Sequence, residues 1–214
     1  MNQRRRIIAV SGATLALMHP LARAAESLVR TPEQMRGPFY PMELPLDRDN
    51  DLATVEGVPG IAHGEITHVV GRVLDEKGRP VKSARVEIWQ VNGYGRYHHK
   101  WDRQNKPWDP HFQGWGQFTT GEDGAYRFRT VKPLPYPGRA PHIHFAIQSR
   151  EFAPLTTQMY LAGAPENRSD QLLNSIRNRE AREALIVDLK RASGDELIGR
   201  FDIVLGTEGV IPKT

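Results

Sequence analysis

The 214-residue chain contains no cysteine, and this absence excludes several classes of protein. Disulfide scaffolds, zinc fingers, iron–sulfur clusters held by cysteine and thiol nucleophiles all need a thiol. Phosphate-binding loops, nucleophile elbows and dinucleotide fingerprints are also missing from the sequence. The remaining composition is that of a globular protein with one domain or at most two.

Net charge is small as well. The formal charge is +4, and Arg4, Arg5, Arg6 and Arg23 account for all of it, since the chain otherwise carries 25 basic residues against 25 acidic ones. A neutral remainder offers no electrostatic field for nucleic acid or for anionic ligands. We therefore expect no nucleic-acid partner.

The basic start of the chain has the pattern of an export signal. Residues 4–6 are arginines, residues 7–18 form a short apolar run, and small residues surround position 24. The run is too short to span a membrane, and we expect no membrane span in the mature form. We therefore interpret residues 1–24 as an export signal peptide that resembles the twin-arginine type, with a disordered basic start as the alternative. This interpretation places the mature protein in the periplasm or outside the cell.

Proline and glycine punctuate the rest of the chain, and no repeat or long linker divides it. Prolines disfavour both helix and ladder pairing, so we expect residues 25–66 to form an extended arm and residues 67–214 to form one domain. Alternating apolar residues between turn signals predict short strands. A short helix is expected over residues 170–178, and residues 180–190 are ambiguous between helix and strand. The predicted fold is all-β, an antiparallel β-sandwich with an extended N-terminal arm and long loops that bear the site. Its strands are expected at residues 67–74, 84–91, 125–131, 142–148, 156–161 and 200–205.

Histidine and tyrosine concentrate between residues 94 and 144, which hold five of the eight histidines and four of the six tyrosines. His142 and His144 flank Ile143, so on a strand both imidazoles point to one face, about 7 Å apart at Cα. Two such imidazoles can converge on one ion; a histidine pair on a solvent-exposed face is the alternative. Tyr136 lies just upstream, between two prolines that stiffen its loop.

The available donors indicate which metal this site would prefer. Without thiolates, only imidazole and oxygen ligands remain, and a phenolate oxygen is a hard anionic donor that suits a small trivalent ion. Two tyrosinates and one hydroxide balance the three charges of Fe(III), and a neutral centre can be buried at low cost. Fe(II) oxygenases would need a carboxylate ligand. Zinc could use the histidines but has little use for two tyrosines.

Several long motifs resemble those of the intradiol ring-cleavage dioxygenases, and most closely the protocatechuate 3,4-dioxygenase branch. The resemblance runs from about Gly37 to Leu205. It implies a β-sandwich with a mononuclear non-haem Fe(III) centre. The motifs are GPFYP at residues 37–41, GRVLDEKGRPV at 71–81, VEIWQVN at 86–92, GRYH at 95–98, DPHF at 109–112, YRFRTVKP at 126–133, PYP at 135–137, RAPHIHF at 139–145 and TQMY at 157–160.

Residue by residue, the resemblance implies a metal ligand set of two tyrosines and two histidines. One tyrosine stays bound throughout and matches Tyr97, and the other is released when substrate arrives and matches Tyr136. Arg139 matches the arginine beside the substrate, and Gln158 matches a polar residue of the pocket; both are expected, with the second tyrosine, to take part in catalysis. The four ligands are Tyr97, Tyr136, His142 and His144.

The implied reaction opens a catecholic ring between its two hydroxyl-bearing carbons with O₂ and yields a muconate-type dicarboxylic acid. The identity of the catechol stays open between protocatechuate, catechol and hydroxyquinol. We expect an oligomer, of like subunits or with a distinct partner chain. The alternative from another class is an exported transthyretin-like β-sandwich that binds a ligand without catalysis. We interpret the other candidate aromatic groups as packing or loop residues: Trp89, Tyr94, His98, His99, His111 and Tyr126.

The export signal leads to a test. Residues 1–24, fused to a reporter that must fold before export, should deliver it beyond the cytoplasmic membrane. Replacing Arg4, Arg5 and Arg6 by lysine should stop that delivery, because the twin-arginine route reads the arginines themselves. Reporter activity is measured in the periplasm and medium. Unchanged export of the lysine variant would indicate the general secretory route instead.

Overall fold

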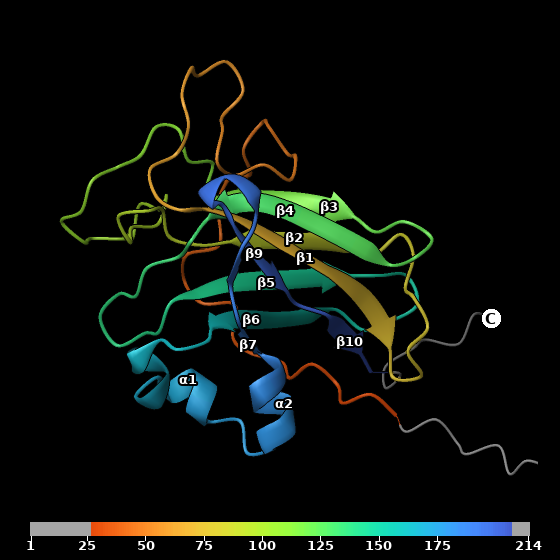
Figure 1. The fold of residues 1–214 in the computed structure, drawn as a ribbon. Coiled ribbons are helices and arrows are strands. Elements are labelled where there is room, and N and C mark those ends of the chain that lie inside the picture. The colour runs from red at the N-terminus through yellow and green to blue at the C-terminus, as the bar shows by residue number, and fades with distance from the viewer. Residues whose placement is uncertain (1–26, 207–214) are drawn as a thin grey trace, which may run out of the picture.

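The structure is a computed structural model that describes residues 27–206, so the export signal expected at residues 1–24 lies outside the described residues. Two five-stranded sheets face each other, and two short helices lie together beyond one edge of the second sheet (Figure 1). None of the helices in the described part is long and apolar enough to cross a bilayer. The elements are β1 (Ile66–Asp75), β2 (Arg85–Trp89), β3 (Trp115–Thr119), β4 (Ala125–Val131), β5 (His142–Gln148), β6 (Leu155–Leu161), η1 (Pro165–Arg168), α1 (Gln171–Asn174), α2 (Arg179–Ala184), β7 (Ile186–Val187), β8 (Lys190–Arg191), η2 (Ser193–Asp195), β9 (Leu197–Arg200) and β10 (Ile203–Leu205).

The first sheet has the order β10-β1-β9-β8, with β4 also paired to β1, and the second has the order β3-β2-β5-β6-β7. The all-β sandwich expected from the sequence is confirmed. The sheets are mixed, however, because β9 and β10 pair parallel to β1 and β7 pairs parallel to β6. These three strands follow the helical stretch after β6, which returns the chain to the sheets in the parallel direction.

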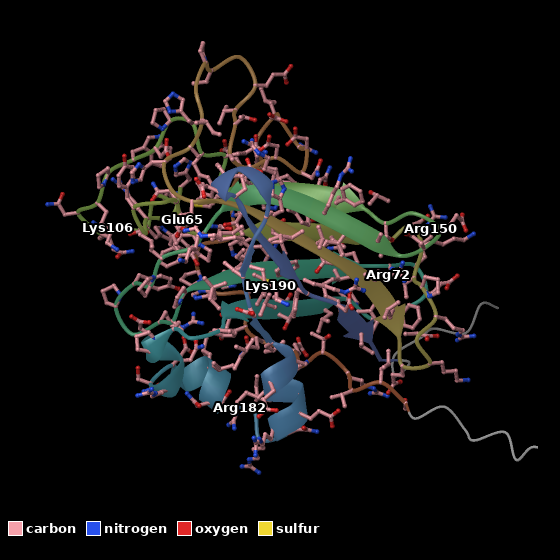
Figure 2. The ribbon with its side chains drawn as sticks, viewed as in Figure 1. Glu65, Arg72, Lys106, Arg150, Arg182 and Lys190 are labelled. Carbon is pink, nitrogen blue, oxygen red and sulfur yellow. The ribbon has the colours of Figure 1, made fainter. Side chains whose placement is uncertain are left out.

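Alternation along the strands builds the core between the sheets. Val69 on β1 and Phe128 on β4 pack from the first sheet against Ile143 and Phe145 on β5 of the second, and all four are almost fully buried. The outer faces carry charge, as Figure 2 shows for Arg72 on β1 and Lys190 on β8. This distribution is the period-two pattern of a sandwich whose inner faces are apolar.

Several strands lie where the alternation predicted them. The ranges 125–131 and 142–148 coincide with β4 and β5. The range 180–190 contains most of α2 and the short strand β7, which explains its ambiguity. The range 200–205 is divided between the end of β9 and β10, because the side chain of Asp202 replaces a main-chain acceptor there and takes the N–H of Arg72 at 2.9 Å.

The arm over residues 27–65 contains no helix or strand, yet its backbone is tied to both sheets. The N–H of Thr31 donates to the carbonyl of Val204 at 3.0 Å, and that of Gln34 to the carbonyl of Thr156 at 2.8 Å. Further along, the N–H of Leu52 donates to the carbonyl of Arg129 at 2.7 Å. The arm therefore runs from β10 past β6 and reaches β4 of the first sheet.

One buried hydrogen bond joins β4 to the connection between β9 and β10. The hydroxyl of Tyr126 donates to the carbonyl of Phe201, between β9 and β10, and both residues are buried. Tyr126→Phe should lower the free energy of unfolding by about 1–3 kcal/mol, because the carbonyl loses its partner. Thermal unfolding measures this, with Tyr94→Phe as the control, since Tyr94 is half-buried and stacks on His63. Equal melting temperatures for the two variants would contradict the assignment.

Candidate metal centre

The histidine pair opens β5 at one end of the second sheet. The neighbouring strands β2 and β6 end at the same place, where Trp89 pairs with His144 and Tyr160 pairs with His142. Ile143 points into the core. His142 and His144 therefore share the opposite face of the sheet, where the arm and the loops before β3 and β5 cover them.

Four side-chain donors converge on this face. The Nε2 atoms of His142 and His144 lie 3.2 Å apart. The hydroxyl oxygen of Tyr97 lies 3.1 Å from Nε2 of His144 and 3.4 Å from Nε2 of His142. The hydroxyl oxygen of Tyr136 lies 3.4 Å from Nε2 of His142. The structure thus brings together all four residues that the resemblance implies as ligands.

Local turns aim the two tyrosines. Gly95, at φ 81°, lets the loop after β2 turn back, and the N–H of Tyr97 donates to Asp102 Oδ2 at 2.8 Å. Tyr136 begins a turn in which the N–H of Arg139 donates to its carbonyl at 2.9 Å. Gly138 has φ 79° at the third position of this turn, where a side chain would be strained. That conformation explains a glycine at this position.

The arm and one strand wall the centre with aromatic rings. Phe39 stacks on Tyr97 with ring centroids 4.6 Å apart, and Trp89 stacks on His144 at 4.8 Å. The interpretation of Trp89 as a core residue is consistent with its 1% exposure. Tyr97, His142 and His144 are all at most 2% exposed. These side chains therefore lie in a site with little access for water.

Burial fixes the charge states of the donors in the metal-free protein. Burial, reinforced by nearby Arg139, lowers the pKa of His142 to about 3, and burial also holds the pKa of His144 well below its ordinary value. Burial raises the pKa of Tyr97 and of Tyr136, although Arg139 opposes the effect at Tyr136. Both imidazoles are therefore neutral and able to coordinate, whereas the phenols need a Lewis acid to release their protons.

The donor set fits a small cation. His142 Nδ1 lies 2.6 Å from the carbonyl of Ala140, which can only accept, so Nδ1 carries the proton and Nε2 directs a lone pair into the site. Donors about 2.1 Å from one ion, at angles of about 90–110°, are about 3.0–3.4 Å apart, and the observed separations fall in this range. Within residues 27–206 no group of three His, Asp or Glu side chains forms a rival metal site.

Arg139 and Gln158 lie beside these donors and contact each other. Arg139 Nη1 points to the hydroxyl of Tyr136 at 3.4 Å, and Nη2 donates to Gln158 Oε1 at 2.5 Å. Gln158 is fully buried, and its amide donates to the main-chain carbonyl of Met35 in the arm at 3.1 Å. Gln158 thus holds the guanidinium and joins it to the arm.

Sequence reasoning missed three residues of this network. Asp170 accepts from Arg139 Nε at 2.9 Å, and the Tyr160 hydroxyl accepts from Arg139 Nη2 at 3.2 Å. That hydroxyl donates in turn to Gln34 Oε1 at 3.1 Å. Asp170 lies 31 residues from Arg139. The one signal in the sequence was its place as the first residue of the helix expected over residues 170–178, where an aspartate is typical of a cap.

The three other candidate histidines make contacts outside the group of four donors. His98 stacks on Trp108 at 3.7 Å, His99 lies edge-on to Phe39 at 5.8 Å, and His111 lies 3.6 Å from the carboxylate of Asp109. Their placement agrees with the interpretation of these histidines as loop residues.

Comparison with known proteins agrees with the resemblance found in the sequence. The family model described as Dioxygenase matches residues 35–207. The chain is 37% identical to the protocatechuate 3,4-dioxygenase beta chain of Burkholderia cepacia over 91% of this chain and 84% of that protein. It is 36% identical to the hydroxyquinol 1,2-dioxygenase of Rhizobium sp. (strain MTP-10005) over 60% of this chain and 46% of that protein.

A solved structure agrees with these relatives in fold. The dioxygenase domain of a dioxygenase carbohydrate-binding protein fusion from Streptomyces sp. SirexAA-E superposes with a TM-score of 0.66 at 30% identity, covering 83% of this chain and 99% of that one. The transthyretin-like alternative receives no support from these relatives. The chain belongs to the intradiol ring-cleavage dioxygenases.

Proposed function

We propose that the centre holds one non-haem Fe(III) and that the protein uses O₂ to open catecholic rings between their hydroxyl-bearing carbons. The observation that carries the proposal is the convergence of two neutral imidazoles and two phenols, whose donor atoms are linked by four separations of 3.1–3.4 Å. When bound there, ferric iron would supply the Lewis acidity that makes a catecholate ring reactive toward O₂.

The two tyrosines have different environments, which supports different roles. Tyr97 is buried and contacts both imidazoles, so we assign it to the permanent ligand position. Tyr136 is only partly buried, contacts one imidazole and lies beside Arg139. With iron bound, Tyr136 would therefore be the tyrosinate best placed to accept a proton from an arriving catechol without disturbing the rest of the centre.

Arg139 supplies the positive charge at the exposed side of the centre. The guanidinium stays protonated at any physiological pH, and its Nη1 edge faces the Tyr136 hydroxyl at 3.4 Å. It is placed to stabilise negative charge that develops on the substrate ring, while Phe39 and Trp89 keep water from the opposite side.

Substrate, assembly and location extend the proposal. The relatives are named for protocatechuate and hydroxyquinol, which share the catechol ring, and we propose that ring as the recognised element. One relative is named a beta chain, which supports assembly into an oligomer. The basic, apolar start of the chain supports export to the periplasm or beyond.

Purified protein should be burgundy-red from tyrosinate-to-iron charge transfer and should consume O₂ with catechols. Tyr97→Phe and His142→Ala should each lower iron affinity about tenfold or more, because even residues that only support a ligand contribute 10- to 100-fold. Iron per chain, the visible spectrum and O₂ uptake against a panel of catechols measure this.

The matched control is Tyr94→Phe, which removes a phenol from the same loop outside the centre. It should keep iron, colour and O₂ uptake. A colourless wild-type protein that takes up no iron would refute the proposed function, as would full iron content and turnover in Tyr97→Phe.

Tyr136→Phe should separate the two tyrosines. It should retain more iron than Tyr97→Phe, because solvent can fill the partly exposed position, but turn over about 100-fold more slowly without an oxygen to accept the substrate proton. Iron content and the shift of the charge-transfer band on anaerobic addition of catechol are measured in both variants. If Tyr136→Phe binds and cleaves catechol like wild type, another ligand must be the one displaced.

A further inference from the structure

We propose that Asp170, a buried carboxylate at the start of α1, is a positioning residue that holds Arg139 with its Nη1 edge toward the metal centre. The inference rests on the proposed function, and it assigns a role to a residue 31 positions away from Arg139 in the chain. The argument depends on how the guanidinium is held and on how the carboxylate divides its two oxygens.

The guanidinium is held on two of its three nitrogens by residues outside the proposed ligand set. Nε donates to Asp170 Oδ2 at 2.9 Å, and Nη2 donates to Gln158 Oε1 at 2.5 Å and lies 3.2 Å from the Tyr160 hydroxyl. Of the three guanidinium nitrogens, Nη1 alone contacts Tyr136 in the described part of the chain. A planar fork fixed at Nε and Nη2 cannot rotate, so the direction of Nη1 is determined by its partners.

The carboxylate of Asp170 uses its two oxygens for different tasks. Oδ1 accepts from the N–H groups of Leu172 and Leu173, at 3.0 and 3.1 Å, and caps α1. Oδ2 accepts from Arg139 Nε and from the N–H of Ala140 at 2.8 Å. The helix cap needs only Oδ1. Oδ2 is therefore devoted to the segment that carries the arginine.

The negative charge of Asp170 is not required for capping α1. Asp170 is 1% exposed, and burial raises the pKa of its carboxyl, but the N–H groups of Ala140 and Leu173 and the Arg139 guanidinium outweigh burial and hold the pKa below its usual range. A buried charge lowers the stability of the fold unless a partner of opposite charge compensates for the lost hydration. Serine would cap a helix without that cost. The ionised form serves the guanidinium.

The contact also reaches the ligand strand. Ala140, whose N–H binds Asp170 Oδ2, presents its carbonyl to His142 Nδ1 at 2.6 Å. The arginine has no other carboxylate among the ion pairs of the described residues, whereas the histidine ring is also held by packing on Tyr160. Loss of Asp170 should therefore disturb Arg139 more than iron binding.

The test uses Asp170→Ser in the iron-loaded protein, because serine keeps a capping oxygen and removes Oδ2. Iron content and the resting charge-transfer band should match wild type, KM should change less than kcat, and kcat should fall about 10- to 100-fold, the range expected when a charged group is misplaced by about 1 Å. Asn178→Ser is the matched control, since Asn178 caps α2 through Ala181 and makes no contact with Arg139. It should keep the wild-type kcat.

A double-mutant cycle decides whether Asp170 acts through Arg139. In an Arg139→Lys background, Asp170→Ser should change kcat by no more than about twofold, because the guanidinium it positions is already gone. The same fall in kcat in both backgrounds, or a wild-type kcat in Asp170→Ser alone, would overturn the proposal. If the serine variant does not fold, Asp170→Asn enters the same cycle; it keeps Oδ1 and places an N–H group against Arg139 Nε. An iron-free or inactive wild type would instead refute the proposed function.

Discussion

Two imidazole nitrogens face each other across 3.2 Å at the start of β5, and the rest of the site follows from that contact. Burial keeps both rings neutral. The proton of His142 lies on Nδ1, against the carbonyl of Ala140, so the lone pair on Nε2 of this ring is directed inward. Inward-facing lone pairs repel unless a cation or a donor lies between them. The phenols of Tyr97 and Tyr136 lie where they can share such a cation and balance its charge.

The residues beside the proposed metal site are balanced in charge as well. The proposed ferric centre, with two tyrosinates and a hydroxide, would be neutral. Beside its site Arg139 and Asp170 form an ion pair that is also neutral, with the Asp170 side chain fully buried. Neither the proposed centre nor the ion pair would leave an uncompensated charge in the low-dielectric interior. The positive end of the ion pair nevertheless faces Tyr136, the more exposed of the two tyrosines proposed as ligands. A field is thus available at the substrate side without a net charge that would destabilise the fold.

Local sequence predicted the parts of this arrangement that depend on period and turn chemistry. Alternation placed His142 and His144 on one face of β5, and the two flanking prolines predicted a stiff loop at Tyr136, which the structure has as a turn. Strand β3 escaped notice because Gly116 interrupts its pattern. A Cβ at Gly116 would lie 2.6 Å from Leu52, so the glycine is required by an arm more than sixty positions earlier in the chain. Asp170 was missed for the same reason, since its partner is distant in sequence.

The arm shows why irregular backbone suits this site. A strand in the same place would spend its N–H groups and carbonyls on ladder pairing. Because Pro32 and Pro38 keep the arm out of the sheet, the carbonyl of Met35 is free to accept from Gln158. Gly37 passes so close that a Cβ there would lie 3.4 Å from the His144 ring. The arm therefore approaches the centre with its backbone at Gly37 and with the ring of Phe39. Its Met35 carbonyl also supports Gln158, which in turn holds Arg139.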